Sequence, residues 1–408
     1  MISYSDIVAA RKRISDAIYF SPCPESVPLS ELVGCHVFCK LDYLQRTGSF
    51  KERGAANALM GLSDDQRCRG VIAASAGNHA LALAYHGQRL GIPVTVVMPR
   101  FAPLIKVTTC RRLGARIVQE GDGFEAARAK ADQLAVAENL TLVHGFDDPA
   151  IIAGQGTIGL EVLEQVPDLD AIIVPVGGGG LIAGIALAIK HVRPEVKIIG
   201  VEPTVMACFS ASRDAGRRVA VAPHATLADG LAVGQPGEIT FTTVQPLIDR
   251  MVTVSEDVLA LAILRLMEME KSVVEGAGAA ALAALMSGQC PELAGKRVVL
   301  LLSGGNIDPA IISRVIEHGM VVDGRLWRFT AVISDRPGGL ERLTRVIAAS
   351  GASVRDIAHD RAFSGADFSA VRVVCTVETM DRDHIGRLQR ALLDAGIVTL
   401  STDGCSGS

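Results

Sequence analysis

Short β-rich runs alternate with longer helical patterns between about residue 69 and residue 203. This alternation is typical of βαβ units, in which parallel strands form a sheet and helices cover its faces. One further parallel strand is expected much later, directly before Ser303-Gly304-Gly305-Asn306. The sequence therefore predicts an α/β fold, with strands at residues 71–74, 94–98, 116–118, 171–174, 197–201 and 297–302.

A different rhythm begins near Trp327. Strand patterns at 328–334, 352–360, 368–378 and 397–400, with helical patterns after the first and the third, give the order βαββαβ of ferredoxin-like domains. The residues from Glu317 to Leu326 form a short joint before this module. We therefore expect a first unit over residues 1–320 and a second over residues 327–402.

Composition limits the partners of this chain. Its 408 residues include 40 Lys and Arg and 44 Asp and Glu, without a long run of one sign that would attract nucleic acid or an anionic membrane. No apolar run is long enough to span a bilayer, and the amphipathic start lacks the apolar core of a signal peptide. The nine scattered cysteines form no CxxC pair and are expected to be reduced. We expect a cytoplasmic protein that acts on small molecules.

Four successive glycines follow the predicted strand at 171–174. Such a run lets backbone N–H groups face a ligand, and the following helix offers its positive end to an anion. The spacing matches neither the GxGxxG nor the GxxxxGK[ST] pattern. Because a tight strand-to-helix turn needs only one or two glycines, a phosphate site is favoured over a purely structural turn. The run is Gly177, Gly178, Gly179 and Gly180.

Three other runs carry residues that could do chemistry. Lys51 lies at a predicted helix start, where burial would favour a neutral, nucleophilic amine, although most lysines are solvated. The run from Ser75 to His79 could surround a carboxylate or simply cap a helix, and for His79 a role without catalysis is favoured. Ser303 could bond a ring nitrogen or cap the next helix. Because parallel-sheet folds place ligands at strand carboxyl ends, all four runs should meet in one cleft.

Taken together, these runs resemble the fold-type II pyridoxal phosphate enzymes, and within them the threonine dehydratases (threonine ammonia-lyases) with a C-terminal regulatory domain. The resemblance spans nearly the whole chain, and it implies two parallel-sheet α/β domains of the tryptophan synthase β type, with a small subdomain at about 46–148 inserted in the large one. It rests on SFKERGA at 49–55, SAGNHA at 75–80, GGGGL at 177–181, DGLAV at 229–233, Glu275 in VEGAGA, and SGGN at 303–306.

The resemblance also implies roles for these residues. Lys51 would carry pyridoxal 5'-phosphate as a Schiff base, with Phe50 against the ring and Asn78 bonded to the ring hydroxyl. Ser303 would face the pyridine nitrogen, and this neutral partner makes the cofactor a weaker electron sink, which favours β-elimination over transamination. The catalytic candidates are Lys51 and Ser75. The phosphate would be held by Gly177, Gly178, Gly179, Gly180 and Leu181, and the substrate carboxylate by Ser75, Ala76, Gly77, Asn78 and His79.

The implied reaction converts L-threonine to 2-oxobutanoate and ammonia, or L-serine to pyruvate, with the Lys51 amine removing the Cα proton. Ala76 stands where similar serine racemases usually have serine, so racemisation should be negligible. Similar enzymes hold a divalent cation with a glutamate matching Glu202 and an aspartate six residues later; Cys208 takes that later place, so we expect no metal. Two alternatives stay open: a dehydratase for serine or another β-hydroxy amino acid, and a non-catalytic amino-acid-binding regulator on the same scaffold.

The C-terminal module resembles an ACT domain through the run Asp335-Arg336-Pro337-Gly338-Gly339-Leu340. This resemblance implies allosteric control by a branched-chain amino acid such as isoleucine or valine, within isoleucine biosynthesis. A purely structural dimerisation domain is the alternative. Either interpretation predicts a homo-oligomer, a dimer or a tetramer.

Overall fold

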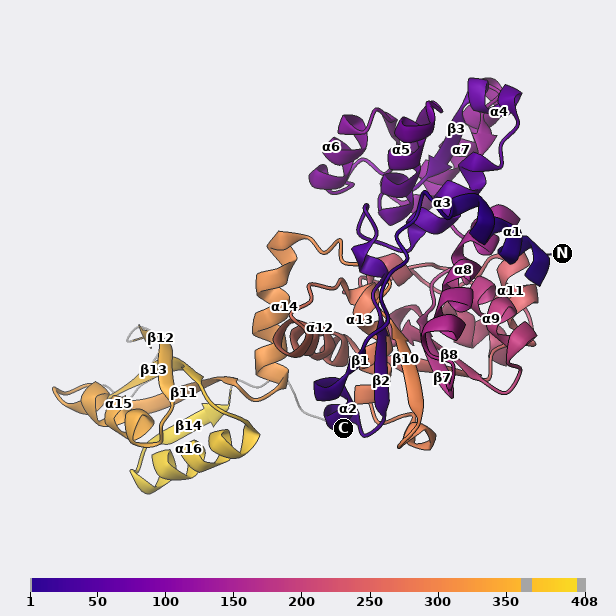
Figure 1. Cartoon of the computed structure of the whole chain (residues 1–408). Coiled ribbons are helices and arrows are strands. Elements are labelled where there is room, and N and C mark those ends of the chain that lie inside the picture. The colour runs from indigo at the N-terminus through magenta and orange to yellow at the C-terminus, as the bar shows by residue number, and fades with distance from the viewer. Residues whose placement is uncertain (1, 361–368, 402–408) are drawn as a thin grey trace. The chain divides into compact units, whose positions relative to one another are not determined.

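The computed structural model describes residues 2–360 and 369–401, in two compact units over Met1–Asp308 and Pro309–Ser408 (Figure 1). The division falls at 308–309, whereas the sequence pattern placed it at 320–327. Helix α14 (Pro309–Val322) contacts the first strand of the second unit, which accounts for the difference. The predicted end of that module at residue 402 and the ninth cysteine, Cys405, lie outside the described residues.

The larger sheet of the first unit has six strands in the order β1-β2-β10-β7-β8-β9, and only β1 is antiparallel to its neighbour. Helices α9 and α13 contact the sheet, and α8 packs on α9. That packing is close, because a Cβ on Gly184 would lie 2.3 Å from the Ile152 carbonyl oxygen. The strands are β1 (Glu25–Ser26), β2 (His36–Lys40), β7 (Ala171–Pro175), β8 (Lys197–Pro203), β9 (Arg250–Val254) and β10 (Arg297–Leu301).

The helices around this sheet alternate with its strands along the chain. The longer ones are α1 (Tyr4–Ile14), α8 (Pro149–Gln165), α9 (Gly180–Val192), α12 (Glu256–Glu270) and α13 (Gly276–Met286). The shorter ones are α2 (Val27–Val33), η1 (Asp42–Leu44), η2 (Thr204–Met206), α10 (Cys208–Asp214), η3 (Asp229–Leu231), α11 (Glu238–Val244) and η4 (Pro291–Leu293).

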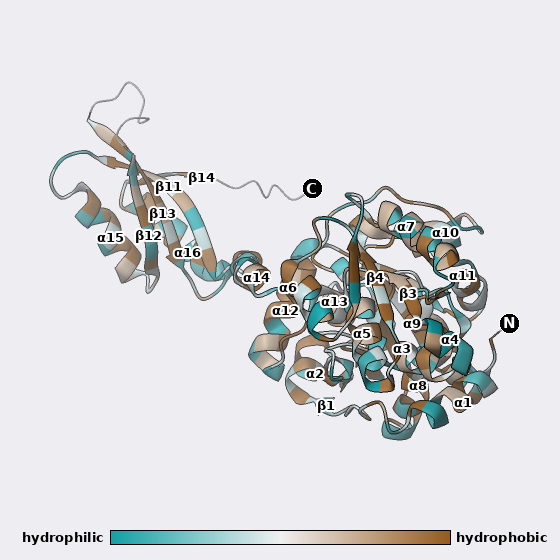
Figure 2. Ribbon diagram, turned by 90° about the horizontal axis from the view of Figure 1, so that it is seen from above, coloured by the Kyte–Doolittle hydropathy of each residue, from teal (hydrophilic) through white to brown (hydrophobic). Residues whose placement is uncertain are grey.

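The smaller sheet is entirely parallel, in the order β5-β4-β3-β6. Its strands β3 and β4 are almost wholly buried and appear brown in Figure 2, as expected for strands covered on both faces. The strands are β3 (Val71–Ala74), β4 (Val94–Met98), β5 (Arg116–Gln119) and β6 (Thr141–Leu142). The helices are α3 (Lys51–Met60), α4 (Asp64–Arg69), α5 (Asn78–Leu90), α6 (Leu104–Arg112) and α7 (Phe124–Ala137).

The second unit has the predicted βαββαβ order, with an antiparallel sheet arranged β12-β13-β11-β14. Its apolar core includes Trp327 stacked on Phe329, with ring centroids 4.2 Å apart. The elements after α14 are β11 (Leu326–Ser334), α15 (Gly339–Ala349), β12 (Ser353–Asp360), β13 (Ala370–Glu378), α16 (Arg382–Asp394) and β14 (Val398–Ser401).

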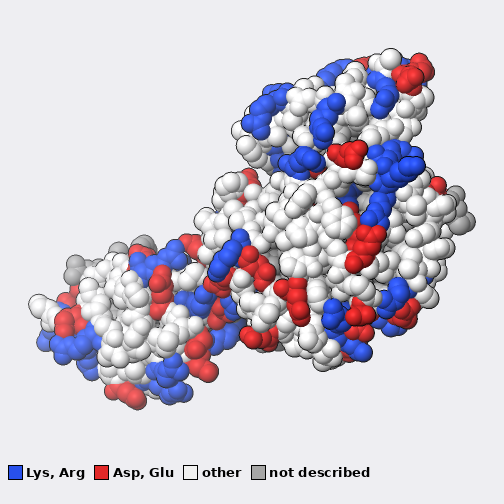
Figure 3. Space-filling view, in the orientation of Figure 1, with Lys and Arg blue, Asp and Glu red and all other residues white. Residues whose placement is uncertain are grey.

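The predicted α/β class and all six predicted parallel strands are confirmed. Strands β1, β2, β6 and β9 were not among those predicted. In the described part of the chain no helix is both long and apolar enough to cross a membrane. Acidic and basic side chains are intermixed over the face drawn in Figure 3.

Candidate active site

Lys51 is the first residue of α3, and the loop before it is held by hydrogen bonds. The Glu52 carboxylate accepts from the backbone N–H groups of Arg46 and Thr47 at 3.1 and 2.9 Å. Gly48 has a φ of +78°, and a Cβ there would meet Asn306 at 2.4 Å, so this turn requires glycine. The loop therefore presents Lys51 in a fixed position.

The Lys51 amine is in a setting that favours its neutral form. Burial lowers its pKa to about 8, and the nearby Glu275 carboxylate opposes this shift. Its Nζ donates to the Gly145 carbonyl oxygen at 2.6 Å and lies 5.2 Å from the centre of the Phe50 ring. A pKa of about 8 leaves roughly a tenth of this amine unprotonated at pH 7, far more than for an ordinary lysine, and the unprotonated form is what a nucleophile or base requires.

The turn after β7 forms the start of α9. Gly179 adopts a φ of +94°, and no backbone N–H from Gly177 to Leu181 donates to an acceptor in the described part of the chain. The Gly178 carbonyl is turned towards α11, where the Thr240 hydroxyl donates to it at 2.6 Å. The free N–H groups and the helix end suit a phosphate.

At two of these positions, packing also requires glycine. A Cβ on Gly178 would lie 2.3 Å from the Phe146 ring, and a Cβ on Gly180 would lie 2.6 Å from the Phe146 carbonyl oxygen. Phe146 thus occupies the space that side chains at both positions would need. Sequence reasoning missed this contact, because Phe146 has no motif of its own.

The run from Ser75 to His79 joins β3 to α5. The Ser75 hydroxyl accepts from the Gly77 N–H at 3.2 Å, which leaves its own proton free to donate. Gly77 and Ala76 carry no side chain that would fill the turn. This turn therefore offers small residues and a hydroxyl to a carboxylate.

His79 points elsewhere. Its ring is buried, Nε2 donates to the Val143 carbonyl oxygen at 3.1 Å, and Nδ1 has no hydrogen-bond partner within the described residues. Burial lowers its pKa to about 3, so the ring is neutral. Only the backbone of His79 remains for the predicted carboxylate contact.

Asn78 is oriented by two residues to which sequence reasoning assigned no role. Its Nδ2 donates to Glu275 Oε1 at 2.8 Å, and its Oδ1 accepts from Asn306 Nδ2 at 2.9 Å. One Asn78 N–H stays free for a ring hydroxyl. Burial raises the pKa of Glu275 to about 7. The signal that could have found them was their place in VEGAGA and SGGN.

Ser303 is buried at the end of β10, and its carbonyl oxygen accepts from the Phe50 N–H at 2.9 Å. Residues Ser49 and Gly304 also pair as an isolated bridge. A Cβ on Gly304 would meet Glu275 at 2.2 Å, so this glycine admits the carboxylate. These contacts tie Ser303 to the loop that carries Lys51.

These residues fit pyridoxal phosphate. An amine of lowered pKa, a cradle of free N–H groups, a serine hydroxyl and an amide N–H match its aldehyde, phosphate, ring nitrogen and ring hydroxyl. The contacts just described bring the four predicted runs together at one end of the two sheets. Phe50 lies beside the Lys51 amine.

A buried network of ion pairs surrounds Arg53, which lies two residues after Lys51 in α3. The sequence did not reveal this network. Arg53 donates to both oxygens of Asp42 at 2.8 and 2.7 Å, to both oxygens of Glu161 at 2.5 and 2.9 Å, and to Thr157. Lys40 bonds Glu161 at 2.5 Å. Burial opposes ionisation of Asp42, but the Arg53 guanidinium holds its pKa below the usual range. The partners are far apart in sequence, which hides the network.

The Glu202 carboxylate has its hydrogen-bond donors within this chain. Its carboxylate accepts from the N–H groups of Phe209 and Ser210 at 2.7 and 2.9 Å and from the Ser210 hydroxyl at 2.8 Å. Among the described residues, no cluster of three or more His, Cys, Asp or Glu is arranged to hold a metal ion.

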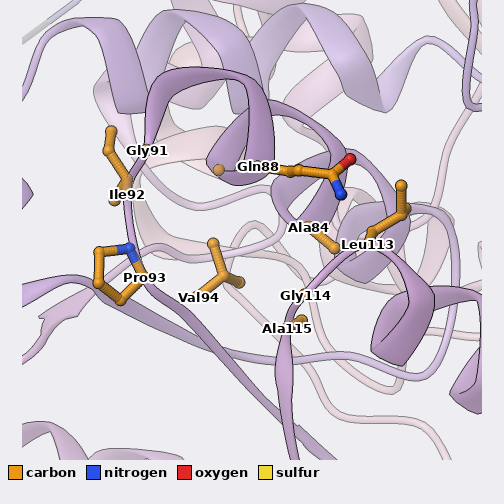
Figure 4. A pocket seen from close by; sticks show the side chains of 10 residues that line it. Ala84, Gln88, Gly91, Ile92, Pro93, Val94, Leu113, Gly114 and Ala115 are labelled. Carbon is orange, nitrogen blue, oxygen red and sulfur yellow. The ribbon is translucent and has the colours of Figure 1, made fainter.

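A separate hollow of about 200 Å³ lies in the small subdomain (Figure 4). None of the candidate residues lines it, and Gln88 supplies its one long polar side chain. Its lining consists of Ala84, Gly87, Gln88, Gly91, Ile92, Pro93, Val94, Leu113, Gly114 and Ala115. This hollow is not part of the candidate active site.

Comparison with known proteins agrees with the site. The model of the pyridoxal-phosphate dependent enzyme family matches residues 14–304. The L-threonine ammonia-lyase of Thermotoga maritima is 43% identical over 396 residues, which cover 97% of this chain and 98% of that protein.

Solved structures show the same relationship. The processed form of threonine deaminase isoform 2 from Solanum lycopersicum has 39% identity and a TM-score of 0.75, and the match covers 78% of this chain and 87% of that one. Maize serine racemase has 33% identity and a TM-score of 0.74, with coverage of 78% and 98%. This chain therefore belongs to the family of pyridoxal-phosphate-dependent enzymes, and within it to the group that contains the threonine ammonia-lyases.

Proposed function

We propose that this enzyme is an L-threonine ammonia-lyase that forms 2-oxobutanoate and ammonia, with L-serine to pyruvate as a secondary activity. The observation that carries the proposal is the buried Lys51 amine, which bonds the Gly145 carbonyl next to Phe146, the residue packed against the loop of unpaired N–H groups. The 43% identity to a threonine ammonia-lyase along almost the whole chain supports it.

Each residue has a task in this reaction. Pyridoxal phosphate, when bound, supplies the electron sink that makes the substrate Cα–H acidic. The free Lys51 Nζ takes the Cα proton, and loss of the β-hydroxyl completes the removal of water. Water then hydrolyses the released enamine to the 2-oxo acid and ammonia. The turn at Ser75–His79 binds the carboxylate, and Asn78 is oriented by Glu275 and Asn306.

Elimination without racemisation follows from position 76. Ala76 offers no hydroxyl to donate or accept a proton on the face opposite Lys51. The similarity to maize serine racemase therefore concerns the fold, and it does not by itself indicate racemisation. We propose also that the reaction needs no divalent metal, since Glu202 is bonded to the backbone of α10.

The remaining proposals concern regulation and context. We propose that the second unit is an ACT-like domain that binds isoleucine or valine, that the enzyme is a homo-oligomer in isoleucine biosynthesis, and that it is cytoplasmic. The turn into α15 supports the first of these, because Gly338 has a φ of +98° and caps the helix as the ACT-like run predicts. Titrating both amino acids while measuring ammonia release tests it, and a flat response to each favours a structural module.

The deciding experiment combines spectroscopy with product analysis. The purified enzyme should show a Schiff-base absorbance band that changes with L-threonine, and Lys51→Ala should lack this band. Ammonia and 2-oxobutanoate should appear without a second nucleophile. A wild-type protein without the band would refute the proposal; a band without product would indicate the non-catalytic regulator. Comparing kcat/KM for threonine and serine separates a threonine from a serine dehydratase.

A further inference from the structure

Residues 143–148 contact three parts of the candidate site: Lys51, the glycine loop and His79. This segment leads from β6 in the small sheet to α8 beside the large one. Gly145 accepts from Lys51, and Phe146 packs against the glycine loop. Asp147 accepts from three N–H groups at the start of α11, at 2.9, 2.9 and 3.1 Å. A change in the path of this segment would therefore move the Gly145 carbonyl oxygen that accepts from the Lys51 amine.

His144 sets that path. Its Nδ1 accepts from the N–H groups of Phe146 at 3.3 Å and Asp147 at 2.8 Å, as an asparagine or aspartate oxygen does in a tight turn. Both bonds need an unprotonated Nδ1, and burial keeps the ring neutral by lowering its pKa to about 4. The ring also packs edge-on against Phe146, with centroids 4.5 Å apart. The turn leaves the carbonyl of Gly145 directed at Lys51 Nζ.

We infer that His144 is a positioning residue for the Lys51 amine, acting through the Gly145 carbonyl, which holds the amine whenever it is not bonded to the cofactor. An amine that donates one N–H to a fixed acceptor has its lone pair directed away from that acceptor. During the reaction this fixes the direction from which Lys51 Nζ takes the Cα proton. The inference rests on the proposed function for its catalytic consequence, and on the 2.6 Å Nζ–O contact for its structural one.

The first test needs no activity. In cofactor-free protein, the pH dependence of Lys51 acetylation by acetic anhydride, read by mass spectrometry, reports the pKa of the amine. An ammonium donates more strongly to a carbonyl than an amine does, so loss of this acceptor should lower the pKa by about one unit. His144→Ala should show this lower pKa. His144→Asn should restore wild-type behaviour, because its side-chain oxygen can accept the same two N–H groups.

The second test uses the loaded enzyme. His144→Ala should lower kcat for L-threonine on the order of tenfold, because Nζ is no longer held in one direction towards the Cα proton. KM should change little, since the turn that binds the substrate carboxylate lies elsewhere. The matched control is His86→Asn, which alters a buried histidine of α5 whose Nε2 has no hydrogen-bond partner within the described residues. It should change neither kcat nor the labelling profile.

The outcomes separate the inference from the proposed function. Wild-type labelling in His144→Ala, or an equal change in His86→Asn, would overturn the inference even if the enzyme is a threonine ammonia-lyase. A wild-type protein without ammonia release refutes the function and leaves the labelling result standing. If His144→Ala does not fold, a structure of the wild-type enzyme with 2-methyl-L-serine, which has no Cα hydrogen, decides: Nζ bonded to the Gly145 oxygen supports the inference, and Nζ elsewhere rejects it.

Discussion

Replacing Arg53 with methionine removes all five guanidinium N–H donors from between two buried carboxylates, Asp42 and Glu161. Lys40 alone would then face both acids, which leaves one uncompensated negative charge in the core. Breaking a buried ion pair on one side costs about 3–5 kcal/mol of unfolding free energy. We expect a loss of that size at pH 7.5. The loss should be smaller at pH 5, where protonation of one carboxyl removes the excess charge.

The matched control is Arg11→Met, which breaks the exposed ion pair between Arg11 and Glu164, a residue on the same helix α8 as Glu161. A surface pair of this kind contributes about 0–1 kcal/mol. Urea unfolding followed by circular dichroism at both pH values measures each variant. Equal destabilisation by the two substitutions, or a loss for Arg53→Met that does not depend on pH, would show that the network is not the source of stability.

Three further outcomes are expected. Burial lowers the pKa values of three histidines, so the unfolded chain binds a proton on each ring first, and each ring should lower the unfolding free energy as the pH drops from 6.5 towards 4, by about 1.36 kcal/mol for every pH unit between its ordinary and its lowered pKa. Burial raises the pKa of Glu275, which acts in the opposite sense, so the test is the difference between two proteins. The wild type should lose stability relative to His86→Asn over this range in urea unfolding, and an equal pH dependence of the two would contradict it. Gly184→Ala should destabilise the enzyme by more than about 1 kcal/mol, because the new Cβ would lie 2.3 Å from the Ile152 carbonyl oxygen. Gly386→Ala, with open space around its Cβ, should not destabilise it, and melting temperatures compare the two variants. Ala76→Ser should introduce measurable D-serine formation from L-serine, which chiral chromatography detects; its absence would mean that a hydroxyl at 76 is insufficient. The histidines are His79, His86 and His144, with pKa values lowered to about 3, 4 and 4.

The parallel strands were predictable because each is a short apolar run bounded by helical patterns, a signal that is local in the chain. Strands β1 and β6 were not, because each has only two residues and exists through pairing with a neighbouring strand. Strand β2 was also not predicted, and its register depends on pairing with β10, which lies more than 250 residues later. Pairing across such distances leaves no mark within the strand itself.

The site residues were likewise predictable only where the signal is local in the sequence. Lys51 and the glycine run stand out because their residue types are unusual for their positions. Glu275 and Asn306 act by orienting Asn78, and His144 by shaping a turn, so their roles follow only from side-chain directions. His79 illustrates the point, because its ring faces the Val143 carbonyl while its neighbour Asn78 faces Glu275 and Asn306. Sequence spacing carries no information about such directions.

Phe146 has a practical consequence for handling this enzyme. Its ring and backbone fill the volume next to Gly178 and Gly180, so protein contacts maintain the shape of the phosphate cradle. The cradle is then ready before any ligand arrives, and cofactor exchange requires no rebuilding of the loop. Dialysis against a carbonyl-trapping amine followed by reloading should return full absorbance and activity in one rapid step, and a Phe146→Ala enzyme should reload slowly and incompletely.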